Sequence, residues 1–294
     1  MNPLELVKLT TLMARTSGSP DVTIGLIDGP VVTQHPELAS EHLREIPGKN
    51  AGTCSRASST ACLHGTFIAG ILSAKRNSPA PAICPACTLL IRPIFSETTS
   101  GREQMPSATP HDLATAIIES INAGARVINL SLGLAQPSTK GEQALDEALN
   151  HAVQRGVIVV AAAGNQSTLG SSAITRHPWV IPVVACTLTG RPTNESNLGS
   201  SIGRQGLRAP GEDITSLGTE EQSLTLGGTS VAVPFVTGTI ALLWSEFPTA
   251  TAAHIKLAIT QASAPQRASV VPPLLDAAAA YQILLTANSR RRIA

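Results

Sequence analysis

The sequence has few aromatic side chains, little net charge and no long hydrophobic run. Aromatic residues make up only 2% of its 294 residues, so Ala, Val, Leu and Ile must fill the core, which lets helices and sheets pack close together. A formal net charge of +1 gives no reason to expect nucleic acid or an acidic membrane surface as a partner. No run reaches the roughly 18 uninterrupted apolar residues that a membrane-spanning helix needs, so none is predicted.

The N-terminus lacks the basic start, apolar run and small-residue cleavage site of a secretory signal. Residues 1–15 instead carry Glu5, Lys8 and Arg15 among apolar residues, which predicts a short amphipathic helix within an extension of residues 1–20. We therefore expect a cytoplasmic protein. No repeat or long linker divides the chain, so residues 1–294 are predicted to form a single domain with a basic, solvated tail at residues 287–294.

The chain has 5 cysteines, an odd number, which argues against an obligate disulfide framework. Cys84 and Cys87 have C-x-x-C spacing, and Cys54 and Cys62 form a looser second pair. Three interpretations of Cys84 and Cys87 stay open: ordinary loop cysteines, a local disulfide, or a zinc site that would need further ligands. The sequence does not decide which of the four form disulfides. Residues 75–82 contain no carboxylate, so no calcium loop is predicted there.

Apolar runs of strand length alternate with segments of helical periodicity along the chain. Such alternation indicates βαβ units, a parallel sheet and right-handed crossovers. Strands are predicted at residues 22–27, 88–95, 126–132, 157–163 and 180–186, and helices from His64 onward and at residues 111–123, 142–155, 235–244, 252–262 and 275–286. Residues 35–63 are rich in Ser, Thr, Gly and Pro and are predicted to be loop with one short helix. The fold class is therefore α/β.

Polar residues stand at the junctions of these elements. Asp28 follows the first strand, His64 opens a helix, Asn165 follows the strand at residues 157–163, and Ser230 lies in the first turn of an apolar helix. In α/β folds, chemistry gathers at the carboxyl ends of parallel strands. Taken alone, Asp28 could be a turn residue, His64 a structural histidine and Ser230 an N-cap.

Two glycines precede Ser230. Gly227 and Gly228 allow close approach of the backbone to a ligand, and a helix N-terminus presents unpaired N–H groups and partial positive charge. This combination suits a developing oxyanion.

The surroundings of these residues carry a family resemblance. The segments Asp28-Gly29, His64-Gly65-Thr66, Ala163-Gly164-Asn165 and Gly228-Thr229-Ser230-Val231-Ala232-Val233-Pro234 resemble the signature segments of the subtilisin-like serine proteases. The order Asp, His, Ser along the chain is also that of subtilisin. The resemblance runs from about Val22 to Ala262 and implies a three-layer fold with a central, mostly parallel sheet flanked by helices.

The resemblance also implies a mechanism. Ser230 would be the nucleophile, His64 the general base and later the acid, and Asp28 would hold the imidazole in the right tautomer. Asn165 would donate its side-chain amide to the oxyanion, together with the Ser230 N–H. Because these groups supply the whole chemistry, no cofactor and no metal is expected.

A peptide substrate is the implied partner. Ser131-Leu132-Gly133 is similar to the strand that pairs with the substrate backbone, and Thr229 is expected in the substrate-binding set. Ala161-Ala162-Ala163-Gly164 is similar to one wall of the pocket for the residue before the scissile bond, and Ala162, Ala163 and Gly164 are its expected substrate-binding residues. These walls are small and uncharged, which disfavours a charged residue in that pocket.

Further segments resemble the protease domains of cyanobactin maturation enzymes, which cut modified ribosomal precursor peptides. They are Asp28-Gly29-Pro30-Val31 with His35-Pro36, Pro93-Ile94-Phe95-Ser96, and Gln205-Gly206-Leu207-Arg208-Ala209-Pro210-Gly211-Glu212. One type of these enzymes also joins the peptide ends into a ring, but its helical insertion has little room between Asp28 and His64. Only 27 residues precede Asp28, too few for the folding pro-domain of secreted subtilisins. Both points favour a cytoplasmic protease that cuts peptides over an enzyme that closes them into rings.

The sequence admits two alternative functions and disfavours a third. A general intracellular endopeptidase would share the same signature, and a catalytically silent pseudoprotease would bind peptides without cutting them. A nucleotide-binding α/β protein is disfavoured, because Asp28-Gly29-Pro30 after the first strand offers neither G-x-G-x-x-G nor a P-loop lysine.

Overall fold

The computed structural model describes residues 2–48, 50–97, 108–132, 142–262 and 269–291. Its strands are Thr23–Asp28 (β1), Leu43–Glu45 (β2), Thr88–Pro93 (β3), Val127–Leu130 (β4), Ile158–Ala162 (β5), Ile181–Cys186 (β6), Leu207–Pro210 (β7), Ile214–Leu217 (β8) and Ser223–Leu226 (β9). Its helices are Pro3–Leu6 (α1), Leu9–Arg15 (α2), Ser40–His42 (η1), Thr60–Ser73 (α3), Pro110–Asn122 (α4), Glu142–Arg155 (α5), Ala173–Arg176 (α6), Ser200–Gln205 (α7), Thr229–Glu246 (α8), Ala252–Gln261 (α9) and Ala277–Arg291 (α10).

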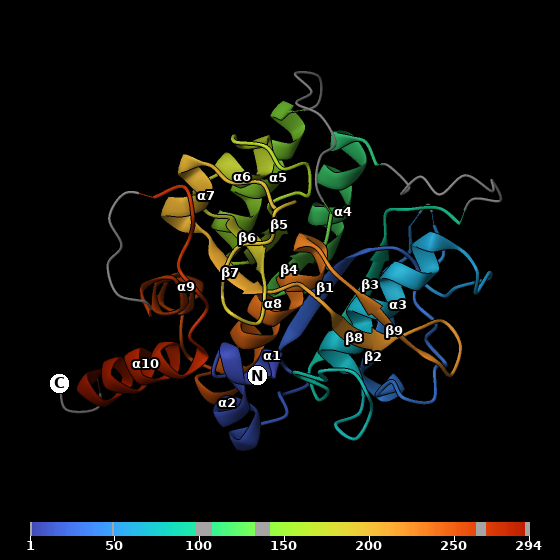
Figure 1. Cartoon of the computed structure of the whole chain (residues 1–294), viewed down its shortest axis with the longest axis horizontal. Helices are drawn as coiled ribbons and strands as arrows, with labels where there is room; N and C mark the ends of the chain where they lie inside the picture. Colours follow the sequence, from blue (N-terminus) through green and yellow to red (C-terminus); the bar gives the residue numbers. More distant parts are fainter. Residues whose placement is uncertain (1, 49, 98–107, 133–141, 263–268, 292–294) are drawn as a thin grey trace.

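A parallel sheet forms the centre of the molecule. Among the described residues, 7 strands join in the order β2-β3-β1-β4-β5-β6-β7, and each neighbouring pair is parallel. Figure 1 shows helices on both sides of this sheet, which confirms the predicted α/β class and three-layer architecture. Because β1 lies between β3 and β4, its C-terminal Asp28 reaches an inner position on the carboxyl edge of the sheet.

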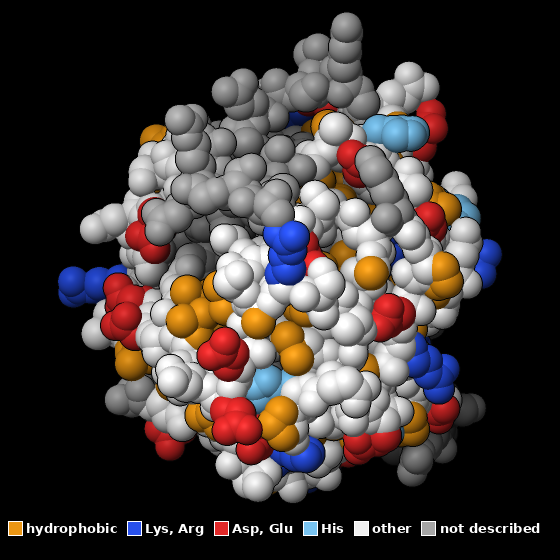
Figure 2. All heavy atoms as spheres, turned by 90° about the vertical axis from the view of Figure 1, so that its right-hand side faces the viewer, with side chains coloured by type: hydrophobic (Ala, Val, Ile, Leu, Met, Phe, Trp, Pro, Cys, Tyr) orange, Lys and Arg blue, Asp and Glu red, His pale blue; other side chains and the backbone are white. Residues whose placement is uncertain are grey.

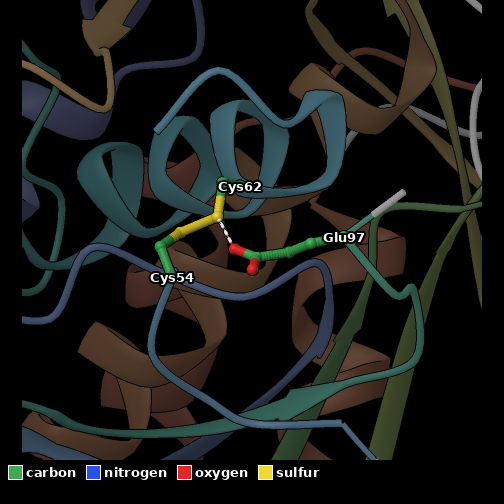
Figure 3. A group of neighbouring side chains, drawn as sticks. All are labelled: Cys54, Cys62 and Glu97. Carbon is green, nitrogen blue, oxygen red and sulfur yellow. Dashed lines mark hydrogen bonds between the residues drawn. A yellow bond between two sulfur atoms is a disulfide. The ribbon is translucent and has the colours of Figure 1, made fainter. Parts of the chain in front are cut away.

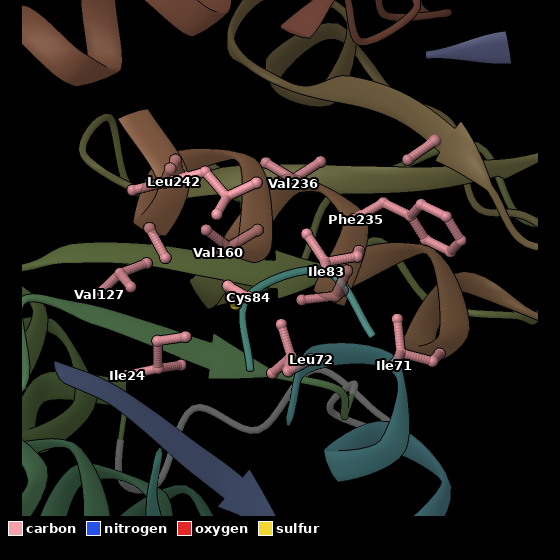
Figure 4. Close-up of a cluster of buried hydrophobic side chains, with 14 of the residues drawn as sticks. Ile24, Ile71, Leu72, Ile83, Cys84, Val127, Val160, Phe235, Val236 and Leu242 are labelled. Atoms are coloured by element: carbon pink, nitrogen blue, oxygen red, sulfur yellow. The ribbon is translucent and has the colours of Figure 1, made fainter. Parts of the chain in front are cut away.

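Two hydrophobic clusters cover the two faces of the sheet. Side chains alternate between the faces along each strand, so Val160 packs on the side of α3 and α8 whereas its neighbour Val159 packs on the side of α4 and α5. Figure 4 shows part of the larger cluster, in which strand residues meet side chains of α3 and α8. Helix α8 is buried along most of its length, as its apolar sequence predicts.

Small residues bring neighbouring elements into close contact. The β8–β9 hairpin, which the sequence did not predict, lies against α3, where the Ser216 hydroxyl donates to the Phe67 carbonyl at 2.8 Å. A Cβ atom added to Gly70 would lie 2.5 Å from Ser216 Oγ. A glycine at this position therefore permits the hairpin to pack directly on the helix.

The prediction that His64 opens a helix is wrong. Helix α3 begins at Thr60, after Ser59 in an extended conformation, so His64 lies in the second turn. The Ser- and Thr-rich composition of residues 35–63 indicated loop, but Ala61 and Cys62 are buried and belong to the packed side of the helix. Strand β2 also falls within this predicted loop.

The two ends of the chain differ from expectation as well. The predicted N-terminal helix is divided into α1 and α2 at Lys8, which has a left-handed φ of 54°. Asn2 and Glu5 close a capping box on α1. At the other end, α10 continues beyond the predicted residue 286 to Arg291, so the start of the predicted solvated tail is helical. The single-domain prediction stays a prediction.

The cysteines divide into two kinds. Cys54 and Cys62 form a disulfide, whereas Cys84, Cys87 and Cys186 are free and buried. Of the three interpretations of the C-x-x-C pair, the structure therefore shows two reduced cysteines that pack within the core.

The surface in the described ranges carries charges of both signs. On the face shown in Figure 2, Lys and Arg side chains are scattered among Asp and Glu side chains. Within the part of the chain that the structure describes, every helix is too short or too polar to cross a bilayer.

Candidate active site

Three side chains from distant parts of the chain form a hydrogen-bonded row. Asp28 at the end of β1 accepts from His64 of α3, with 2.7 Å between Asp28 Oδ1 and His64 Nδ1. His64 Nε2 lies 3.1 Å from Ser230 Oγ in the first turn of α8. A carboxylate can only accept, so the proton of neutral His64 lies on Nδ1, and Nε2 is left to accept from the Ser230 hydroxyl.

Two glycines permit this close approach of α3 to β1. A Cβ atom added to Gly29 would lie 1.9 Å from the Ala61 carbonyl oxygen, and one added to Gly65 would lie 2.4 Å from the Pro30 carbonyl oxygen. Backbone would collide in both cases, so a side chain at either position would push His64 away from Asp28. The glycines next to the predicted Asp and His thus fix their spacing.

The environment of His64 favours its charged form. Burial lowers the pKa of His64, but the negative charge of Asp28 and the hydrogen bond to it together outweigh burial, so the pKa is raised above its ordinary value. Asp28 is fully buried, and its second oxygen, Oδ2, has no hydrogen-bond partner among the described residues. An imidazolium formed during a reaction would therefore lie beside a desolvated carboxylate.

Asn165 faces the same site from the loop after β5. Its Oδ1 accepts from both the backbone N–H and the hydroxyl of Thr229, each at 2.9 Å. These bonds fix the orientation of the amide. Its Nδ2 group has no hydrogen-bond partner within the described ranges. Gly228 has a φ of 113°, and a Cβ atom there would lie 2.9 Å from Asn165 Nδ2. Glycine therefore leaves space beside an amide donor that neighbours the first turn of α8.

Thr229, the residue before Ser230 on α8, fixes the position of the Asn165 side chain. Its side chain is fully buried, and its hydroxyl also accepts from the Gly164 N–H at 3.2 Å. The observed partners of Thr229 are thus Asn165 and Gly164, and its contact with a substrate stays a prediction.

Asn197 is a residue of this site that sequence reasoning missed. Its side-chain oxygen accepts from the N–H groups of Gln166 at 3.0 Å and Thr168 at 3.1 Å. Its backbone N–H donates to the Gly164 carbonyl at 2.8 Å, and its Nδ2 donates to the Ala163 carbonyl at 3.2 Å. Asn197 therefore secures both sides of the loop that carries Asn165. Nothing in its Ser- and Asn-rich sequence context distinguishes it from a surface loop residue.

Ser131 connects β4 to the start of α8. Its hydroxyl donates to the Ser230 carbonyl at 2.9 Å and accepts from Asn129 Nδ2 at 2.7 Å. Asn129 in turn accepts from the Thr237 hydroxyl at 2.9 Å. This buried row of hydrogen bonds fixes the turn that presents Ser230.

The other predicted substrate-binding residues border the same region. The last register pair of β4 with β5 is Leu130 and Ala161, so Ser131 and Leu132 continue beyond the paired part of the sheet. Ala162, Ala163 and Gly164 follow at the end of β5. Gly133 lies outside the described residues. The structure thus brings the described members of this set to the carboxyl edge of the sheet, near the row of Asp28, His64 and Ser230.

Metal ligands gather elsewhere. Among the described residues, one group of three potential ligands lies close together, namely Cys54, Cys62 and Glu97. It contains none of the four predicted catalytic residues.

Comparisons with known proteins identify relatives of the chain. The profile of the subtilase family, Peptidase S8, matches residues 19–282. A thermophilic serine proteinase from Bacillus sp. (strain AK1) is 34% identical over 231 residues, which cover 79% of this chain and 54% of that protein. The chain therefore spans about half the length of this curated relative.

Solved structures with the same fold include two that are named as maturation proteases. The protease domain of PatA has a TM-score of 0.84 and 31% identity, covering 92% of this chain and 97% of that one. The prenylagaramide maturation protease PagA has a TM-score of 0.81 and 28% identity, covering 94% of this chain and 98% of that one. The resemblance predicted from the signature segments is confirmed, and the chain belongs to the subtilase family.

Proposed function

We propose that the chain is a serine endopeptidase that cuts a precursor peptide during the maturation of a natural product. The hydrogen-bonded row from Asp28 through His64 to Ser230 is the observation that carries the proposal. Ser230 Oγ attacks the carbonyl carbon of the scissile bond while His64 Nε2 takes its proton. The protonated His64 then gives that proton to the leaving amine, and water hydrolyses the acyl-enzyme by the same route in reverse.

Two donors are positioned for the oxyanion of the tetrahedral intermediate. One is Asn165 Nδ2, whose orientation Thr229 and Gly228 support. The other is the N–H of Ser230 in the first turn of α8, where helix N–H groups have no intrahelical acceptor. Preorganised donors of this kind stabilise charge that develops only in the transition state.

The pH dependence of hydrolysis follows from the raised pKa of His64. The base must be neutral, so kcat/KM is expected to rise with pH, with its midpoint above the ordinary histidine value of about 6.5. The measurement is kcat/KM across the range of about pH 5 to 9, with a substrate that has no titrating group. A flat profile would contradict the assignment of His64 as the base, and a midpoint below about 6.5 would contradict its raised pKa.

The substrate class rests on the relatives and on the form of the site. PatA and PagA are named as maturation proteases of patellamide and prenylagaramide. The continuation of β4 at Ser131 and Leu132 can accept an extended peptide strand, which binds backbone without selecting side chains. The walls at Ala162 and Ala163 are small, so selectivity is expected to come from contacts along an extended substrate. A cytoplasmic location remains a prediction.

The test compares a cognate precursor peptide with casein and with a short peptide spanning the same bond. Energy from remote contacts raises the rate only when it is used at the reacting centre, so the short peptide should lose kcat as well as affinity. Products are identified by mass spectrometry, with Ser230→Ala as the control. Equal turnover of casein and precursor would instead show a general endopeptidase. Failure of a phosphonate probe to label Ser230 would show a pseudoprotease.

A further inference from the structure

Two cysteines and a glutamate meet beside the helix that carries His64. Cys54 lies in the loop before α3, Cys62 in the first turn of α3, and Glu97 follows β3 (Figure 3). One ligand atom from each of these residues lies within 4.8 Å of the others. Cys62 is buried, and Cys54 and Glu97 are partly buried, so solvent reaches part of the cluster.

The Glu97 carboxylate is held firmly against the sulfur atoms. Its Oε1 accepts from the N–H groups of Ser55 at 2.9 Å and Arg56 at 3.2 Å, and its Oε2 accepts from the Ser55 hydroxyl. These bonds aim Oε1 at Cys62 Sγ, 2.5 Å away. A flexible surface glutamate would instead turn toward water.

The contact between Glu97 and Cys62 is not explained by the disulfide. A sulfur atom in a disulfide carries no proton, so it cannot donate a hydrogen bond to a carboxylate. The two atoms therefore lie side by side in the oxidised protein without a hydrogen bond between them. After reduction, a cation could take both the carboxylate and the thiolates as ligands.

We propose that, when the Cys54–Cys62 disulfide is reduced, Cys54 Sγ, Cys62 Sγ and the Glu97 carboxylate bind one Zn²⁺ ion. The ligand types fit zinc, which takes thiolate and carboxylate ligands in tetrahedral sites, and a water molecule would complete the tetrahedron. The Cα atoms of the two cysteines are 5.7 Å apart, so side-chain rotation can move both sulfurs to about 2.3 Å from a shared ion.

The redox balance requires an external dithiol. The dithiol transfers two electrons and two protons to the protein disulfide and becomes a disulfide itself, leaving two protein thiols. Zn²⁺ then displaces the two thiol protons into solvent as it binds. The protein pair can therefore exist as a disulfide, as a metal-free dithiol or as a dithiolate with bound metal.

The location of the site gives it a structural effect on the triad region. The Cys54 N–H donates to the Val31 carbonyl at 3.0 Å, three residues beyond Asp28. Cys62 precedes His64 in α3, and the Ile94 N–H next to β3 donates to the Asp28 carbonyl at 2.8 Å. Zinc would thus join the segments that carry Asp28 and His64 without taking part in the reaction. The site is independent of the proposed proteolytic function.

The experiment uses the full chain, reduced with dithiothreitol, freed of reductant under anaerobic conditions and titrated with Zn²⁺ or with Co²⁺ as a coloured probe. We expect one bound metal per reduced chain, none per oxidised chain, and a thiolate-to-Co²⁺ charge-transfer band. Cys54→Ser and Cys62→Ser should each abolish the band. Glu97→Gln should weaken affinity by at least the roughly 10- to 100-fold typical of losing a supporting residue. Because Glu97→Gln leaves both cysteines in place, it keeps the test valid if a cysteine variant fails to fold.

The matched control is the Cys84→Ser, Cys87→Ser double variant, which removes the other cysteine pair. It should bind metal as the parent does. Each of the following results would overturn the proposal: no metal retained by the reduced chain, metal lost in the control but kept in Cys54→Ser, or a Cys54–Cys62 disulfide that dithiothreitol leaves intact. Unchanged affinity in Glu97→Gln would remove the carboxylate from the site and also overturn the proposal as stated.

Discussion

Ser230→Ala and His64→Ala are each expected to lower kcat for amide hydrolysis by about 10⁶-fold, the magnitude known for loss of these roles in subtilisin. Without His64 no base takes the proton of the Ser230 hydroxyl, and without Ser230 the base has no nucleophile to activate. The double variant should therefore be hardly slower than either single variant. Steady-state rates of the three purified variants, measured on one peptide substrate, test this expectation.

Two controls separate chemistry from folding in that experiment. Ser245 lies on the same helix as Ser230, and its hydroxyl donates to the Ala241 carbonyl at 2.9 Å, so Ser245→Ala should keep full activity. The midpoint temperature of thermal unfolding of Ser230→Ala should be close to that of the parent. Among the described residues, the removed hydroxyl forms a hydrogen bond with His64 alone. Additive losses in the double variant would show that the two residues do not act as one unit.

Asn165→Ala is expected to lower kcat by about 10²- to 10³-fold with little change in KM, as loss of an oxyanion donor does in subtilisin. The oxyanion exists only near the transition state, so a donor aimed at it contributes little to binding the substrate. Separate determination of kcat and KM on a substrate whose chemistry limits the rate is the measurement needed.

Asn194→Ala provides the matched control for Asn165→Ala. Asn194 is an exposed asparagine in a neighbouring loop segment, and its removal should leave both constants unchanged. If Asn165→Ala raised KM and left kcat alone, Asn165 would be a residue that binds the ground state. The proposed oxyanion site would then have to be abandoned.

The sequence predicted the centre of the fold well because the relevant signals are local. The apolar run before Asp28 and the run before Asn165 each identify a buried strand, and the carboxyl ends of parallel strands meet at one edge. The glycines beside Asp28 and His64 were part of the recognised signature. Their steric necessity appears only in the structure, where Ala61 and Pro30 occupy the space that a side chain would need.

The features that the sequence did not predict share a physical cause. Each depends on contacts between residues that are distant along the chain. Strands β8 and β9 carry Ser and Thr on short segments, so no apolar run distinguished them. Asn197 acts through bonds to a loop about 30 residues earlier in the chain, which no local pattern encodes. The start of α3 was missed because polar composition at residues 55–60 outweighed the buried Ala61 and Cys62.

The close contact of Gly29 with α3 also means that the proposed activity requires a completely folded chain. His64 lies 36 residues from Asp28 and 166 residues from Ser230 along the chain. Closing loops of that length takes place late, because many chain conformations must be given up before the contact forms. A partly synthesised chain has no Ser230 to activate, and a loosely collapsed one cannot bring Gly65 onto Pro30. The proposed proteolytic activity would therefore appear only after the protein has passed through its partly folded stages.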